Sequence, residues 1–131
     1  MEDVFKVEII SPENIVYTGD AAMTTMPSYE GDMSILKGHI PLITFLRPGI
    51  IKVKKNDNNF QDFFIEEGTV EFYDNSLVIL SASAKNTKDL SKDFIDSLTK
   101  ETEKKLDQKN ITDQDRYILN HKLDAIKELR V

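Results

Sequence analysis

The 131-residue sequence contains no cysteine and no tryptophan. Without a thiol the chain has no cysteine nucleophile, iron–sulfur ligand or Cys-based zinc site, and it is not a disulfide-stabilised secreted scaffold. No run of residues approaches the roughly twenty apolar positions that a membrane-spanning helix needs. Acidic residues precede the first apolar run, a pattern that fits neither a signal peptide nor a transit peptide. We therefore expect a soluble protein that reaches a membrane only through a partner.

Basic charge is also scarce, because 17 Lys and Arg residues stand against 23 Asp and Glu, a net charge of −6. This balance argues against a general nucleic-acid binder, whose affinity comes from neutralising phosphates. The charge is uneven: residues 1–84 hold 6 basic and 13 acidic side chains, and residues 85–131 hold 11 and 10. All five glycines and all four prolines lie in the first part. Composition therefore predicts two units, residues 1–84 and residues 85–131.

Short apolar runs separated by turn signals fill the first unit. Their spacing of about ten residues, without helical periodicity, is typical of a sandwich or a barrel. The expected strands are residues 4–9, 15–17, 23–26, 50–54, 60–65, 69–73 and 77–80. We predict an all-β domain, a β-sandwich, over residues 1–84.

The second unit has the pattern of two amphipathic helices. Ser91 is placed to cap the first helix and Thr112 the second, where acidic residues in the first turn favour the helix dipole. The short link between them predicts an antiparallel hairpin. Two helices of this size bury little apolar surface by themselves. The hairpin must therefore pack on the β unit, on another subunit, or alternate between the two, and all three alternatives stay open.

Candidate catalytic and metal-ligating residues are few. His39 is expected in a loop between strands, with neither a nucleophile nor an orienting carboxylate close in sequence. Glu30, Asp32 and His39 match no metal-ligand spacing, so we expect no metal site. His121 is predicted on the solvated flank of the second helix, and the two glutamates at residues 66–67 at a solvated strand edge. The residues alone indicate a non-catalytic interaction module.

The stretch at residues 30–44 reads EGDMSILKGHIPLIT and resembles the signature of the epsilon subunit of bacterial F-type ATP synthases. The likeness continues in register through LRPGIIKV at residues 46–53. The segments FKVEIISPE at residues 5–13, FIEEGTVEF at 64–72 and LVILS at 77–81 fit strands of the same family. The similarity covers essentially the whole chain, including the order of β unit and helical hairpin.

The resemblance implies a non-catalytic rotor subunit of the central stalk, without a cofactor, held against the gamma subunit and the c ring. Such a subunit couples proton transport to ATP synthesis, and it associates peripherally with the cytoplasmic face of the bacterial inner membrane. Matching positions imply that Glu30, Gly31 and Asp32 contact the c ring and that His39 lies toward gamma. The alternative is a free-standing protein-interaction module unrelated to energy coupling.

One motif of the family is altered here. Many bacterial relatives carry the ATP-binding pattern aliphatic-Asp-x-x-Arg-Ala at the start of the first helix. The matching residues 90–95 read LSKDFI, so Ser91 and Phe94 replace the aspartate and the arginine. An apolar side chain cannot make the charge-assisted contact of an arginine with phosphate. We therefore expect weak ATP binding or none.

In some relatives the hairpin inhibits ATP hydrolysis by extending into the head formed by the alpha and beta subunits. Positive side chains that would suit acidic loops there are Lys92, Lys100, Lys104, Lys105 and Arg116. A solvated helix face with paired charges explains the same residues equally well. Both interpretations stay open.

Overall fold

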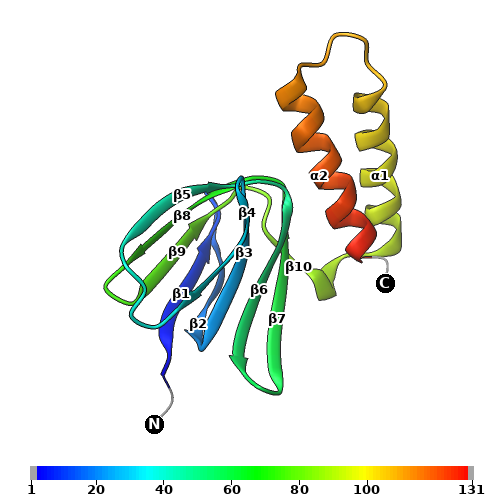
Figure 1. Ribbon diagram of the computed structural model, residues 1–131. Helices are drawn as coiled ribbons and strands as arrows, with labels where there is room; N and C mark the ends of the chain where they lie inside the picture. The colour runs from blue at the N-terminus through cyan, green and yellow to red at the C-terminus, as the bar shows by residue number, and fades with distance from the viewer. Residues whose placement is uncertain (1–2, 130–131) are drawn as a thin grey trace.

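The computed structural model describes residues 3–129, and it consists of a β unit with two helices standing beside it (Figure 1). The strands are β1 (Phe5–Ile10), β2 (Ile15–Ala21), β3 (Met23–Ser28), β4 (Gly31–Leu36), β5 (Leu42–Leu46), β6 (Gly49–Asn56), β7 (Asn59–Ile65), β8 (Gly68–Tyr73), β9 (Ser76–Leu80) and β10 (Lys85–Asn86). A 3₁₀ turn (Thr87–Asp89), α1 (Lys92–Leu106) and α2 (Asp113–Leu129) follow. The predicted β-sandwich followed by a helical hairpin is confirmed.

The strands form a continuous sheet that folds over on itself. Their order is β10-β7-β6-β3-β5-β8-β9-β1-β2, and β4 lies off this path, paired with β3 along its whole length, Met23–Ser28. Only β1 and β9 run parallel among the described strand pairs. A single residue pair joins β3 to β5, and there the sheet passes from one layer to the other. The Tyr17 ring of β2 packs 5.3 Å from the Phe63 ring of β7, so strands near opposite ends of the sheet meet across the core.

The apolar core lies between the two layers. Alternate residues of a strand point to opposite faces, and in β1 the inward set is Phe5, Val7 and Ile9, all buried. The other strands contribute Ala21, Met26, Ile35, Leu46, Ile51, Val53, Phe63, Ile65, Val70, Phe72, Leu77 and Ile79. Each large side chain contributes about 1.5–3 kcal/mol when it is fully buried. This core explains how the chain folds without disulfides.

The strands β4 and β5 lie outside the ranges expected from the sequence pattern. Gly31 and Gly38, both with positive φ, bracket β4 and make this segment look like a loop. In β5 apolar residues occupy both faces of the strand, so the alternation that marks a half-buried strand is absent. The sheet also continues beyond Ala84, because Lys85 and Asn86 of β10 pair with β7.

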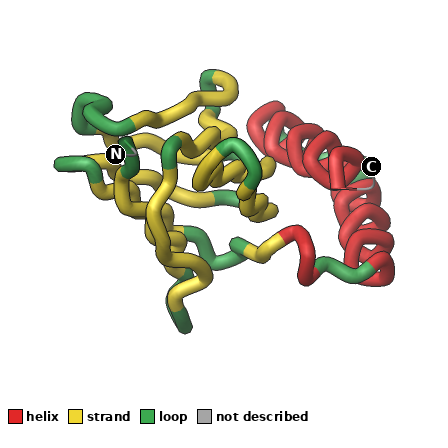
Figure 2. Tube along the Cα trace, turned by 90° about the horizontal axis from the view of Figure 1, so that it is seen from below, coloured by secondary structure: helices red, strands yellow, loops and turns green. Residues whose placement is uncertain are grey.

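The helices begin at the caps that the sequence predicts. The Ser91 hydroxyl accepts a hydrogen bond of 3.1 Å from the Phe94 backbone N–H, and the Thr112 hydroxyl accepts one of 3.0 Å from Asp115. Figure 2 shows both helices together on one side of the β unit, joined to it through the 3₁₀ turn. Within residues 3–129 neither helix is both long enough and apolar enough to cross a bilayer.

Candidate functional site

The three residues that the resemblance assigns to the c ring lie on the β3–β4 hairpin. Glu30 occupies the turn, whereas Gly31 and Asp32 open β4 rather than lying in a loop. The Ser28 hydroxyl donates a 2.5 Å hydrogen bond to the Gly31 carbonyl, and Gly31 has a φ of 126°, which L residues adopt only with strain. The Asp32 side chain is 71% exposed and accepts a hydrogen bond from Arg47 at 3.3 Å. This turn therefore presents two acidic side chains to solvent.

His39 lies at the other end of β4, in the loop that leads to β5. Its Nδ1 is 2.7 Å from the Ile40 carbonyl oxygen, and its ring packs edge-on against Phe72 with centroids 5.8 Å apart. The six residues of β4 span about 20 Å, so the structure does not bring His39 together with Glu30 and Asp32. In the described part of the chain no group of His, Asp and Glu residues is arranged to hold a metal ion.

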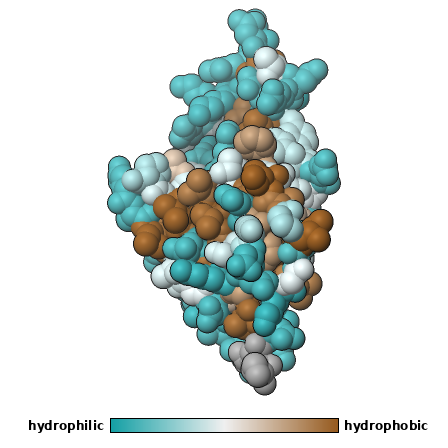
Figure 3. Space-filling view, turned by 90° about the vertical axis from the view of Figure 1, so that its left-hand side faces the viewer, coloured by the Kyte–Doolittle hydropathy of each residue, from teal (hydrophilic) through white to brown (hydrophobic). Residues whose placement is uncertain are grey.

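An exposed apolar surface covers the outer side of β5, β8 and β9, and we call it the exposed apolar face. Its large side chains are Ile43 (78% exposed), Phe45 (65%), Tyr73 (59%) and Leu80 (51%). Cross-strand register puts Phe45 beside Thr69 and Thr69 beside Leu80, so the face is continuous across three strands. Figure 3 shows apolar side chains gathered in a band on this side of the molecule. Apolar surfaces of this kind mark binding sites for other proteins.

Sequence reasoning from strand patterns missed this face. The available signal was the run from Leu42 to Leu46, in which four of five consecutive residues are apolar. A strand with one solvated face normally alternates apolar and polar residues. Apolar residues on both sides of a short strand therefore indicate that the outer side also has a partner.

The outer side of β6 and β7 is covered by the hairpin. The buried centre of this contact consists of Phe64 from β7, Leu98 from α1, and Ala125 and Ile126 from α2. Partly buried side chains that surround it are Ile50, Leu90, Phe94, Ile95 and Leu129. Phe64 points outward from the β unit and is nevertheless only 1% exposed. The hairpin therefore closes a surface that would otherwise resemble the exposed apolar face.

Two ion pairs cross the same contact. The Lys122 ammonium of α2 is buried and pairs with the Glu66 carboxylate, which follows β7. Lys52 of β6 pairs with Glu128 of α2 at 3.0 Å, and this hydrogen bond raises the pKa of Lys52. Glu67 is exposed, as predicted for a solvated strand edge, while the Glu66 side chain is 40% exposed and in addition pairs with α2. The partner of Glu66 comes from a helix 56 positions further along the chain, which no local pattern reveals.

Three rings connect α2 with the β3–β4 turn. The Tyr117 hydroxyl donates a 2.9 Å hydrogen bond to the Tyr29 carbonyl, and the two rings stack with centroids 6.0 Å apart. The His121 ring packs against Tyr117 with centroids 4.4 Å apart. His121 is half-buried rather than solvated as predicted, because α2 turns this flank toward the β unit.

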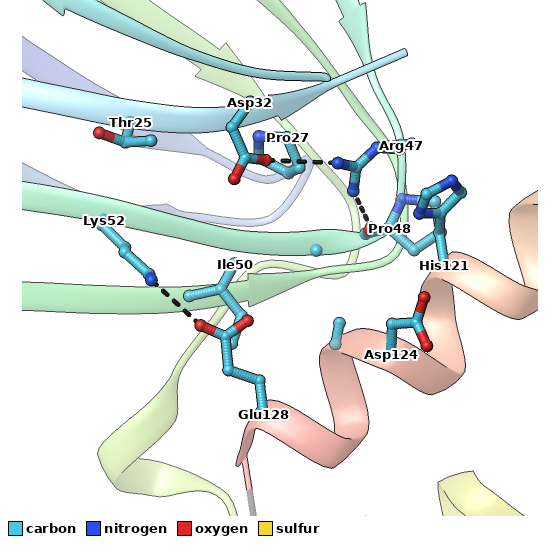
Figure 4. A pocket seen from close by; sticks show the side chains of 12 residues that line it. Thr25, Pro27, Asp32, Arg47, Pro48, Ile50, Lys52, His121, Asp124 and Glu128 are labelled. Atoms are coloured by element: carbon cyan, nitrogen blue, oxygen red, sulfur yellow. Dashed lines mark hydrogen bonds and ion pairs between the residues drawn. The ribbon is translucent and has the colours of Figure 1, made fainter. Parts of the chain in front are cut away.

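A cleft of about 300 Å³ separates this part of α2 from β3, β4 and β6 (Figure 4). Arg47 points into it and hydrogen-bonds Asp32, while Gly49 lies so close to Pro27 that a Cβ there would meet the proline ring at 2.6 Å. Burial, followed by the nearby Arg47 charge, lowers the pKa of His121. Positive and negative side chains pair with one another here, so the cleft does not concentrate charge of one sign.

At the start of α1 the two altered motif residues have structural contacts. Ser91 caps the helix, and Phe94 packs on the buried contact between hairpin and β unit. The Lys85 ammonium lies 5.3 Å from the centre of the Phe94 ring. The five basic residues singled out on the hairpin are all exposed, and Lys105 pairs with Glu101 at 3.3 Å.

Comparison with known proteins relates the sequence to one family. Residues 4–87 match the family described as the ATP synthase delta/epsilon chain β-sandwich domain. The ATP synthase epsilon chain of Pelagibacter ubique is 40% identical over 132 residues, covering 98% of this chain and 99% of the relative.

Solved structures support the same fold. A chain in the F1/c-ring structure of Euglena gracilis mitochondrial ATP synthase superimposes with a TM-score of 0.74 at 18% identity, covering 98% of this chain and 80% of that one. A chain in the central stalk and c-ring structure of the Tetrahymena thermophila enzyme gives 0.67 at 18%, covering 96% of each. The match over residues 4–87 spans more than half of the sequence, and the 40% identity extends over nearly all of it. This chain belongs to the family of ATP synthase epsilon chains.

Proposed function

We propose that this protein is a non-catalytic rotor subunit of the central stalk of a bacterial F-type ATP synthase, where it helps to couple proton transport to ATP synthesis. The observation that carries the proposal is the 40% identity to an epsilon chain over 98% of the sequence. The exposed apolar face supports it, since a subunit of a stalk needs a surface for a permanent neighbour.

The exposed apolar face is the surface that docks on gamma in this proposal. Burying Ile43 and Phe45 against a partner supplies the apolar contact, and the loop that holds His39 leads directly into β5. The acidic turn with Glu30 and Asp32 lies at the other end of β4 and contacts the polar loops of the c ring. Acidic side chains there complement basic loop residues.

Catalysis belongs to other subunits of the complex in this account. Within the described residues, His39 and His121 lie in different units, and no cluster of His, Asp and Glu side chains is arranged for a metal. Association with the cytoplasmic face of the inner membrane is through gamma and the c ring.

The start of α1 does not form an ATP site in this proposal, because Ser91 and Phe94 are used for capping and packing. Isothermal titration of the isolated protein with Mg-free ATP should show no binding with a dissociation constant in the low-micromolar range. A low-micromolar affinity would contradict this part of the proposal.

The hairpin acts as a brake on ATP hydrolysis if its basic residues reach the head of the complex. A chain that ends after Asp89 removes both helices and keeps β10 in the sheet. Faster ATP hydrolysis by a complex that contains this shortened chain would establish that the hairpin inhibits hydrolysis. An unchanged rate would mean that the exposed lysines are only a solvated helix face.

Co-purification tests the main proposal. An affinity tag on the chain, expressed in its own cells, should recover the alpha, beta and gamma subunits and the c ring from detergent-solubilised membranes. Recovery of the tagged chain as a lone monomer would favour a free-standing interaction module instead.

A further inference from the structure

The acidic turn, residues 28–32, is a part of the proposed partner surface that the helical hairpin touches. The Tyr117 hydroxyl of α2 donates its 2.9 Å hydrogen bond to the Tyr29 carbonyl, which belongs to the turn rather than to a strand. The two rings stack with an interplanar angle of 15°. Tyr117 lies 88 positions along the chain from Tyr29, so this tether comes from a different unit of the fold. One side chain of the hairpin therefore holds the backbone of the turn directly.

Tyr117 is itself held in place on α2. Its ring packs against that of His121, one helical turn further along, with centroids 4.4 Å apart and an interplanar angle of 64°. The Tyr117 ring thus contacts one ring of its own helix and one ring of the turn. A hydroxyl on a ring that is packed in this way loses little further side-chain freedom when it donates its hydrogen bond. The tether is therefore preorganised by the hairpin.

The other restraints on the turn leave its tip without support. The Ser28 hydroxyl binds the Gly31 carbonyl within the turn, and Arg47 binds the Asp32 carboxylate, whose side chain is 71% exposed. An ion pair with one partner so exposed contributes little to holding a segment in place. Nothing lies within 4 Å of the position that a Cβ would occupy on Gly31, so packing does not restrain this flexible residue. The Tyr29 tether therefore decides where the tip of the turn lies.

The acidic turn also lines a groove of about 490 Å³. The groove is lined by residues 28–33 together with Leu42, Thr44 and Phe45 of β5. Phe45 belongs to the exposed apolar face, so the groove joins that face to the carboxylates of the acidic turn. A displacement of the turn changes the width of this groove, and with it the spacing between acidic and apolar contacts that a partner meets.

We propose that Tyr117 is a positioning residue, which holds the acidic turn in the conformation that binds the c ring, so that α2 acts on this binding through the turn. The inference rests on the proposed contact between the turn and the c ring, and it requires no detachment of the hairpin. A binding loop that is already fixed in its bound conformation loses less conformational entropy on association and binds more tightly. Loss of the Tyr117 hydroxyl alone should therefore weaken binding.

Backbone NMR of the full-length chain tests the tether itself. In Tyr117→Phe both ring contacts remain possible, but the side chain can no longer donate a hydrogen bond. We expect lower order parameters confined to residues 29–31, with the amide shifts of α2 otherwise kept. Glu128→Gln is the matched control, because it breaks the 3.0 Å ion pair with Lys52, which also joins α2 to the β unit but lies away from the turn. It should leave the order parameters of the turn unchanged.

Binding is measured with the full-length chain and a purified complex of the gamma subunit and the c ring. Tyr117→Phe should raise the dissociation constant about threefold to tenfold, the range expected for loss of one hydrogen bond that preorganises the turn. Glu128→Gln should leave the dissociation constant unchanged. A weaker affinity together with a looser turn, in Tyr117→Phe only, is the result that supports the inference.

Three results would overturn it. If the unaltered chain does not bind the complex of gamma and c ring, the proposed function fails, and this inference fails with it. If the unaltered chain binds, but Tyr117→Phe binds equally well or keeps the order of the turn, only the role of Tyr117 is overturned. Equal losses in Tyr117→Phe and Glu128→Gln would overturn that role too, since the effect would then come from loosened hairpin packing rather than from the tether.

Discussion

The two outer sides of the β unit differ in how far their apolar side chains are covered, as one phenylalanine on each side, Phe45 and Phe64, shows. Both point away from the core, yet Phe45 is 65% exposed and Phe64 is 1% exposed. The difference lies in the chain that covers them, since α1 and α2 pack over β6 and β7 and leave β5, β8 and β9 bare. One sheet thus carries an apolar surface that the hairpin covers and another that stays exposed, for which we propose a partner in a different protein.

This contrast separates what stabilises the chain from what serves its assembly. Side chains under the hairpin should affect folding and hairpin packing, whereas those of the exposed apolar face should affect only association. The following substitutions test that separation, beginning with the largest expected effect on stability.

Replacement of a buried isoleucine in the hairpin should have the largest effect. Ile126 is 1% exposed, so Ile126→Ala should lower the free energy of hairpin packing by about 2–5 kcal/mol, through lost burial and a cavity. Hydrogen exchange of α2 amides measures this loss. Ile43→Ala, at 78% exposure on the exposed apolar face, is the matched control and should change stability by about 0.5 kcal/mol or less. Equal effects would contradict the comparison.

The ion pair of Lys122 and Glu66 should respond unequally to removal of its two partners. The Lys122 side chain is 7% exposed and that of Glu66 is 40% exposed. Glu66→Gln leaves a buried ammonium without its carboxylate and should cost about 1–3 kcal/mol. Lys122→Met leaves a carboxylate that water can reach, and should cost less. Urea unfolding of both variants measures the difference, and the reverse order would show that the pair does not hold the hairpin.

Loss of the α1 cap should have a smaller, local effect. Ser91→Ala removes the acceptor for the Phe94 backbone N–H and should destabilise α1 by about 1 kcal/mol. Ser91→Asp keeps an acceptor and should restore the stability. Faster amide exchange confined to the first turn of α1 is the expected result. Unchanged exchange in Ser91→Ala would mean that packing of the hairpin, rather than the cap, fixes the start of the helix.

Features that depend on neighbouring residues could be predicted from the sequence, and features that depend on distant segments could not. The caps at Ser91 and Thr112 lie within three residues of the groups they bind, so local pattern was sufficient. His121 was predicted in solvent, and no local pattern reveals the partner of Glu66, because the groups that contact them come from other units of the fold. Resemblance identified the family, yet it did not reveal that Phe45 belongs to a continuous exposed surface.

The central claim is that the exposed apolar face docks this chain on the gamma subunit. The most direct measurement is the affinity of purified gamma for the chain and for its Phe45→Asp variant, with Phe60→Asp as control, since Phe60 is 53% exposed on β7 outside that face. We expect Phe45→Asp to weaken binding about tenfold or more, because a charge replaces buried apolar area, and Phe60→Asp to leave it unchanged. Equal affinity of the unaltered chain and the Phe45→Asp variant would contradict the claim.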